Sequence, residues 1–220
     1  MKRRTLDILF SVGGVALAAL LLVLGLVLTS NASFSKNYVS DQLSQQKITF
    51  TPRAALSAEE SQSACLVKYA GQPLTTGKQA ECYANDYIGL HVKSTKGAEG
   101  KTYAELGGPQ RELQAQVTEA QASNDPALPQ LEQKLADLGK ARDTLFKGET
   151  LRGLLLTSYG FSVFGVKANQ VATVAYSVSA LLALLSMAGF VHALRTPGNK
   201  AFAAPEPVRA EVKDKQLVGV

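Results

Sequence analysis

Two long runs of uncharged, mostly apolar residues, one near each end of the chain, dominate its hydrophobic pattern. The first extends from Ile8 to Thr29 and the second from Val171 to Leu194. A helix rises about 1.5 Å per residue, so roughly 20 residues cover the ~30 Å hydrocarbon core of a bilayer. The pattern therefore predicts two transmembrane helices, at residues 8–29 and 171–194.

Basic residues near the two runs indicate an orientation. Lys2, Arg3 and Arg4 precede the first run, and Arg195 and Lys200 follow the second. Because such residues concentrate on the cytoplasmic side, we predict a multi-pass protein of the cell (inner) membrane. Both termini, residues 1–7 and a flexible tail at 195–220, are then cytoplasmic, and residues 30–152 form the main extracytoplasmic domain.

A cleaved signal peptide is the alternative interpretation of the first run. Ser30, Asn31 and Ala32 supply small residues at a spacing that suits cleavage. However, the run exceeds the apolar core of about 7–15 residues that is typical of a signal peptide. We therefore favour a retained anchor, and cleavage stays an open alternative.

Two capping boxes predict short helices in the outer segment. Ser57 with Glu60 is expected to open a helix toward Tyr69, and Thr76 with Gln79 is expected to open a second helix. The second helix has apolar positions at helical spacing, which predict one buried face. That face consists of Ala80, Tyr83, Ala84, Tyr87, Ile88 and His91.

A helical hairpin is predicted farther along the chain. Pro109 is a suitable first helical residue, and Asn124 to Pro126 interrupts the helix that it begins. The next stretch has the 4-3-4-3 spacing of a coiled-coil seam, formed by Leu131, Leu135, Leu138, Arg142 and Leu145. Since no comparable strand pattern occurs, the predicted fold class is all-α.

Residues 153–170 carry an apolar stretch that is too short to cross a bilayer. Gly153 to Val166 contains no charge, and no strong helix breaker separates Leu131 from Arg195. We therefore expect a long stalk helix that runs into the second span. Its apolar side chains need a cover, from residues 34–46, from the cysteine-bearing helices, or from another subunit.

Small residues recur at near-heptad spacing in the second span. In lipid, small residues let helix backbones approach closely, so we expect a packing face against the first span or a neighbouring subunit. An alanine-rich span without a special face is the alternative. The expected packing residues are Ala172, Ala175, Ser179, Ala183 and Ser186.

Composition and charge narrow the class of protein further. The 220 residues are 46% hydrophobic and 19% charged, with a net charge of +5. Residues 31–150 hold 13 basic and 14 acidic groups, so the basic surplus lies near the predicted membrane boundaries. Without a basic cluster, nucleic acid is not an expected partner. The expected partners are membrane lipid and another protein or further copies of this chain.

Cys65 and Cys82 are the only cysteines and lie in the predicted outer domain. An oxidising compartment favours a disulfide between them, with two free or reactive thiols as the alternative. His91 and His192 lack ligand-spaced partners, so we predict no metal, no cofactor and no catalytic residue. His91 is expected to be a packed, partly buried side chain.

Several short motifs resemble a family of actinobacterial two-span membrane proteins of unknown function. They include Gln46-Lys47-Ile48 and, most specifically, the Thr-Thr-Gly-x-Gln-Ala run. Family members often carry the label of an aromatic ring-opening dioxygenase, but that chemistry needs iron ligands that two isolated histidines do not supply. The residues that carry the resemblance are Tyr69, Gly71, Thr75, Thr76, Gly77, Gln79, Ala80, Tyr83 and His91.

These patterns favour a non-enzymatic role. The leading hypothesis is an accessory or scaffold subunit that presents its extracytoplasmic helical domain to a partner in the envelope. A homo-oligomeric channel or transport element, with Asn169, Thr173 and Ser177 along a path, is the alternative. An envelope enzyme is the third hypothesis.

Overall fold

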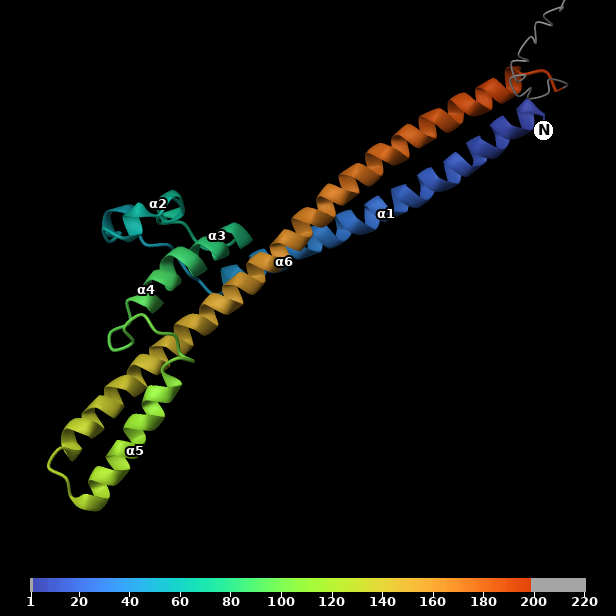
Figure 1. Ribbon diagram of the computed structural model, residues 1–220. Coiled ribbons are helices and arrows are strands. Elements are labelled where there is room, and N and C mark those ends of the chain that lie inside the picture. The colour runs from blue at the N-terminus through green and yellow to red at the C-terminus, as the bar shows by residue number, and fades with distance from the viewer. Residues whose placement is uncertain (1, 199–220) are drawn as a thin grey trace, which may run out of the picture. The chain divides into compact units, whose positions relative to one another are not determined.

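A computed structural model describes residues 2–198, and this range is helical without a named strand (Figure 1). The predicted all-α class is therefore confirmed. Of the predicted cytoplasmic segments, Met1 and residues 199–220, including Lys200, lie outside the described residues. The elements are α1 (Arg3–Gln45), η1 (Arg53–Ala55), η2 (Glu60–Gln62), α2 (Ala64–Tyr69), α3 (Gly77–Cys82), η3 (Tyr83–Ile88), α4 (Gly89–Lys93), α5 (Gly107–Ser123) and α6 (Leu128–Arg195).

The chain divides into two compact units, which we describe separately. Unit 1 comprises Met1–Leu26 and Ala172–Val220, and unit 2 comprises Val27–Val171. Helices α1 and α6 each contain an apolar stretch that is long enough to cross a membrane. Helix α6 is continuous from Leu128 to Arg195, as the lack of strong helix breakers predicted.

In unit 1 the segments of α1 and α6 run side by side (Figure 1). They pack along a seam of small and hydroxyl-bearing residues. The Ser179 hydroxyl donates a hydrogen bond of 2.7 Å to the carbonyl of Ala18. A Cβ added to Gly14 would overlap the Ser186 hydroxyl, so glycine permits the close approach here. Among the predicted packing residues, Ala183 is half-buried. The other four are buried: Ala172, Ala175, Ser179 and Ser186.

Large apolar side chains occupy the outside of unit 1. They come from both helices and include Phe10, Leu20, Val174, Leu184 and Leu194, all of which are exposed. A soluble helix pair would bury these groups and expose its serines, because burial of apolar surface drives folding in water. Unit 1 therefore has the reverse polarity along its seam, where the hydroxyls of Ser11, Ser179 and Ser186 are buried while large apolar side chains lie outside.

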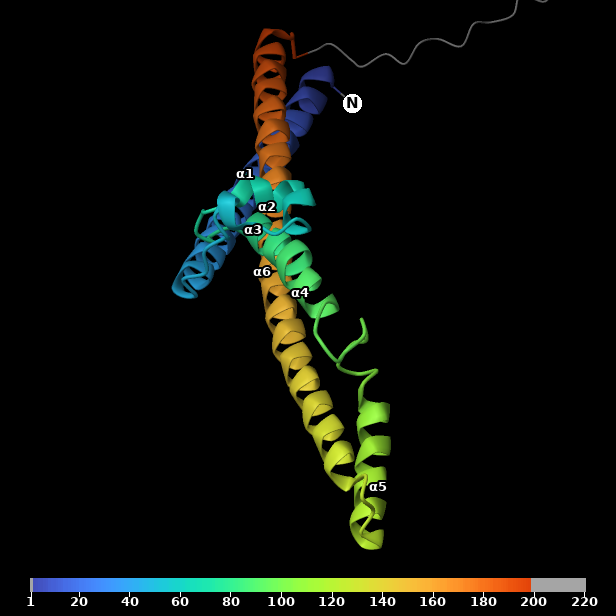
Figure 2. The same ribbon diagram turned by 90° about the vertical axis from the view of Figure 1, so that its left-hand side faces the viewer.

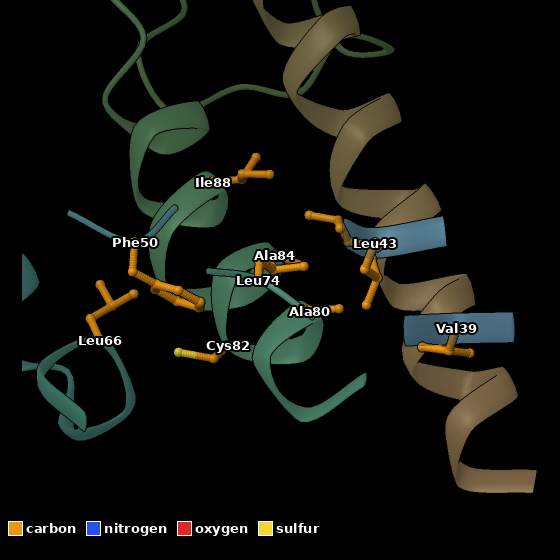
Figure 3. Packing of buried hydrophobic residues seen from close by; sticks show 10 residues of the cluster. Val39, Leu43, Phe50, Leu66, Leu74, Ala80, Cys82, Ala84 and Ile88 are labelled. Atoms are coloured by element: carbon orange, nitrogen blue, oxygen red, sulfur yellow. The ribbon is translucent and has the colours of Figure 1, made fainter. Parts of the chain in front are cut away.

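Unit 2 has a conventional hydrophobic core (Figure 3). Ala80 and Ala84 face Val39 and Leu43 of α1 there, and Phe50 lies on the other side of these alanines. Leu155 of α6 belongs to the same cluster. Residues 34–45 and the cysteine-bearing segment thus cover one side of the apolar stalk in unit 2, as two of the predicted covers would.

Helices α5 and α6 form an antiparallel pair in unit 2 (Figures 1 and 2). Gln121 of α5 donates a hydrogen bond of 3.2 Å to Glu132 of α6. The guanidinium of Arg142 donates to the Gln110 side chain and lies 4.2 Å from the ring centre of Tyr103. The residues of the predicted coiled-coil seam are half-buried or, for Leu145, fully buried.

The helix predicted from Ser57 to Tyr69 is wrong in part. Ser57 and Glu60 make both hydrogen bonds of a capping box, at 2.7 and 3.1 Å. The box opens only the short η2, because Ser63 adopts an extended backbone and caps α2 by accepting from the amide of Leu66. A second capping side chain inside the predicted helix therefore divides it.

The prediction of a single buried face through His91 is also wrong. Tyr83–Ile88 forms a π-helical segment, whose wider turns rotate the following residues away from α-helical spacing. Ala80, Ala84 and Ile88 remain buried. His91 is displaced from this face, and its side chain is 55% exposed.

We predict that Gly14→Leu separates the helices of unit 1. The new side chain would occupy the space of the Ser186 hydroxyl, and overpacking of this kind costs about 1–3 kcal/mol. Cysteines introduced at Ala18 and Ser179 would be joined with a short thiol-specific crosslinker in membranes. The yield of crosslinked protein should be severalfold lower with Gly14→Leu than with Gly14. Gly13→Leu is the matched control, because an added Cβ at Gly13 meets nothing within 4 Å. An equal loss of crosslinking yield in both variants would contradict close packing of the two helices at Gly14.

Candidate functional site

The Thr-Thr-Gly-Lys-Gln-Ala segment at the start of α3 is organised around the side chain of Gln79. This side chain is buried, and its Oε1 accepts from the backbone amides of Thr75 and Thr76 at 2.9 and 3.0 Å. In return, the Thr76 hydroxyl accepts from the backbone N–H of Gln79 at 3.3 Å, which completes the predicted capping box. Gln79 therefore satisfies amide groups that the short helix would otherwise leave unpaired.

Gly77 lets the start of α3 lie directly against α6. A Cβ at this position would overlap the side chain of Ser162 and would lie 3.5 Å from the Cα atom of Tyr159. Next to it, the Lys78 ammonium lies 2.9 Å from the Glu81 carboxylate and 3.4 Å from the Tyr159 hydroxyl. Hydrogen bonds to these two groups raise the pKa of Lys78, so its ammonium stays charged.

Aromatic rings connect the remaining residues of the family-like motif. Phe50 contacts Tyr69 and Tyr83, with ring centres 5.5 and 5.3 Å apart, and Tyr83 stacks on Tyr87 at 4.5 Å. Burial, with a smaller contribution from Tyr87, raises the pKa of Tyr83 to about 12. Tyr83 is therefore a neutral, packed phenol at physiological pH.

His91 lies at the end of this row of rings. Its ring centre is 4.5 Å from that of Tyr87, and its Nδ1 is 2.8 Å from the Tyr87 carbonyl oxygen. Its Nε2 is 3.8 Å from the buried carboxylate of Glu60. The His91 side chain is 55% exposed and packs over Tyr87 and Glu60, in agreement with the expectation of a packed, partly buried ring.

Gly71 shapes the connection between α2 and α3. Its φ of +73° lies in the left-handed region that favours glycine. Its backbone amide donates to the carbonyl of Phe50 at 3.2 Å. The backbone amide of Leu74 donates to the carbonyl of Ile48 at 2.9 Å. Each motif residue described so far has a packing or backbone role, and Ala80 is fully buried in the core of unit 2.

Cys65 and Cys82 form a disulfide, with Cα atoms 6.0 Å apart. The bridge joins α2 to the end of α3. The Asp86 carboxylate lies 2.7 Å from the sulfur of Cys65 and also accepts from Ser63 at 2.9 Å. A neighbouring carboxylate opposes formation of a thiolate, which is the reactive form in disulfide exchange. The position of Asp86 therefore favours a structural role for the bridge over a redox-active one.

Cys65, Cys82 and Asp86 also form a set of three close potential metal ligands within residues 2–198. Their ligand atoms lie within 4.8 Å of one another. Metals bind cysteine as the thiolate, and both sulfurs are covalently joined here. In the oxidised protein this group therefore cannot act as a two-thiolate site.

Thr173 and Ser177, which the channel hypothesis places along a path, lie on the exposed side of α6 in unit 1. The Ser177 hydroxyl donates to the carbonyl of Thr173 at 2.9 Å, within its own helix. Asn169 belongs to unit 2 and lines a cavity there. The three residues are spaced four apart on the continuous helix α6, so they lie on the same face of it.

Comparisons with known proteins add no assignment to this geometry. No protein-family model, no curated protein and no solved structure matches the chain. The resemblance of the family-like motif therefore stays a hypothesis.

We predict that removal of the disulfide destabilises unit 2. For cysteines separated by 17 positions, a bridge stabilises a fold by about 3 kcal/mol in the chain-entropy model. The variant with Cys65→Ser and Cys82→Ser should unfold at a clearly lower temperature in circular dichroism of the full-length protein in detergent. Reductant should lower the melting temperature of the wild type to that of the variant. A wild type that melts identically with and without reductant would argue against a stabilising bridge.

We also predict that Gln79→Leu destabilises unit 2 by about 2 kcal/mol. Leucine keeps the apolar volume but leaves the amides of Thr75 and Thr76 without their acceptor, at about 1–3 kcal/mol for a buried unpaired group. Gln79→Glu is the matched control, because it retains a side-chain oxygen in the same place. Thermal unfolding of both variants would be compared, and equal destabilisation by both would refute the role of the Oε1 acceptor.

Proposed function

We propose that this protein is a two-span membrane protein that acts as a non-enzymatic accessory or scaffold subunit. Its disulfide-bridged helical domain would face the extracytoplasmic side and bind a protein partner in the envelope. The observation that carries the membrane location is the reversed polarity of unit 1, where Ser11, Ser179 and Ser186 are buried and large apolar side chains are exposed. Such a surface suits a hydrocarbon solvent rather than water.

Charge and redox chemistry support the proposed orientation. Lys2, Arg3 and Arg4 precede the first apolar run, and Arg195 follows the second. The Cys65–Cys82 disulfide lies between the two runs. Disulfides persist mainly in oxidising compartments, so the bridge agrees with an extracytoplasmic position for unit 2.

An exposed aromatic patch on unit 2 supports the scaffold role. The patch consists of Phe34 and Tyr38 of α1 and Phe161 of α6. Phe34 stacks on Tyr38 at 5.7 Å, and both rings meet Phe161 edge-on, at 6.5 and 5.7 Å. The Ser35 hydroxyl holds the two helices together by donating to the Phe161 carbonyl at 2.8 Å. Rigid, exposed aromatic side chains are enriched at the centres of protein interfaces.

The proposal is tested by site-specific photo-crosslinking in native membranes. A benzophenone-bearing phenylalanine at Phe34 or Phe161 should form an adduct with one partner protein. The same group at Phe10, an exposed phenylalanine of unit 1, should react with lipid only and is the matched control.

Three results would contradict the proposal. Alkaline carbonate that releases the protein from membranes would refute the membrane location. Lipid-only adducts at all three phenylalanine positions, with a monomer on native electrophoresis, would refute the scaffold role. Protease added to spheroplasts should cleave residues 30–152, and complete protection would contradict the orientation.

A further inference from the structure

A cavity of about 800 Å³ opens into unit 2 beside the start of α3. Three separate segments line it: residues 32–40 of α1, the turn Thr75–Lys78, and residues 162–170 of α6. Gly77 and Gly165 bring these walls close together, since an added Cβ at either position would collide with a serine of a neighbouring segment. The cavity is therefore built by packing between elements far apart in the sequence.

The cavity wall carries both positively charged and apolar side chains. Ala32, Val39 and Val166 provide apolar lining, whereas Lys36 and Lys78 are its charged residues. No aspartate or glutamate is among the described residues that line it. Although Lys78 contacts Glu81 outside the lining, its side chain is 68% exposed and its ammonium has three donors. The cavity thus suits a molecule with one anionic end and one apolar end.

The position of the lining residues along the helices indicates the source of such a molecule. Ala32 follows the predicted first span by three residues, and Gln170 directly precedes the predicted second span. We propose that this cavity binds the headgroup and upper acyl chain of an anionic phospholipid. Lys36 and Lys78 would contact the phosphate, and the exposed side chain of Val166 would contact the chain. This inference rests on the membrane location proposed above.

The hydroxyl and amide groups of the cavity add hydrogen-bonding capacity for the headgroup. The hydroxyls of Thr76 and Ser162 already donate to Gln79 and to the Tyr159 carbonyl, so the donors that the lining offers come from Ser33 and Ser40 of α1. A phosphodiester has several acceptor oxygens, and charge-assisted bonds to them are stronger than neutral ones. These groups lie on the same wall segment as Lys36, so a single headgroup can meet both.

Native mass spectrometry of the full-length protein in detergent would test the inference, with phosphatidylglycerol and phosphatidylcholine as probes. The wild type should retain phosphatidylglycerol preferentially. Lys36→Gln with Lys78→Gln should reduce this preference by roughly fivefold per lysine. Val166→Trp, at an exposed position of the wall, should block the apolar part and remove one bound lipid.

Matched variants separate the cavity from general surface effects. Lys101→Gln with Lys134→Gln removes two charges outside the lining, and Leu154→Trp adds the same bulk at another exposed position of α6. Both should bind lipid like the wild type. If they lose binding as strongly as the cavity variants, or if the cavity variants bind normally, the lipid site is refuted.

A further arm distinguishes a lipid from a soluble anion. Excess glycerol phosphate should fail to displace phosphatidylglycerol, because it lacks the acyl chains. Displacement would overturn the lipid assignment in favour of a soluble phosphate ester. Carbonate extraction tests the membrane location independently, so a protein that stays in the membrane yet shows no lipid preference refutes only this inference.

Discussion

Close approach of the backbones of α1 and α6 at small residues is the constraint on which both units depend. In unit 1 it occurs where Gly14 meets Ser186 and where Ser179 donates to the Ala18 carbonyl. In unit 2 it occurs where Gly165 meets Ser35, whose hydroxyl donates to Phe161. Hydroxyl groups in these seams donate to carbonyls of the neighbouring helix and add polar contacts to the packing.

The long helices could be predicted because their signals are local. Apolar periodicity, capping side chains and the positions of Pro and Gly lie within a few residues of the structure that they determine. The division at Ser63 and the π-helical segment at Tyr83–Ile88 could not be predicted in the same way. Both Ser57 and Ser63 can cap a helix, and the sequence does not reveal which of two competing caps begins the longer one. The widened turns around Tyr83 permit its packing against Phe50 and Tyr87, contacts that depend on tertiary structure.

The candidate site shows the same difference between local and distant signals. The capping role of Thr76 and Gln79 was predictable, since these residues are three apart. The contact of Gly77 with Ser162 was not, because 85 positions separate the two residues in the sequence. For the same reason, no sequence pattern indicated the cavity that the turn at Thr75–Lys78 shares with α1 and α6. Helix capping and close packing thus account for the residues of the Thr-Thr-Gly-Lys-Gln-Ala segment, which could otherwise be taken for a functional motif.

Helix α6 also shows why hydropathy alone could not separate a span from a stalk. Leu155 and Leu184 are the same residue type in the same continuous helix. Leu155 is 3% exposed in the core of unit 2, whereas Leu184 is 61% exposed on unit 1. Water favours the first arrangement because Leu155 is removed from solvent, and the proposed membrane location would account for the second, because lipid would solvate Leu184. Two stretches of similar apolar composition in one helix therefore differ in burial, and hydropathy alone does not reveal the difference.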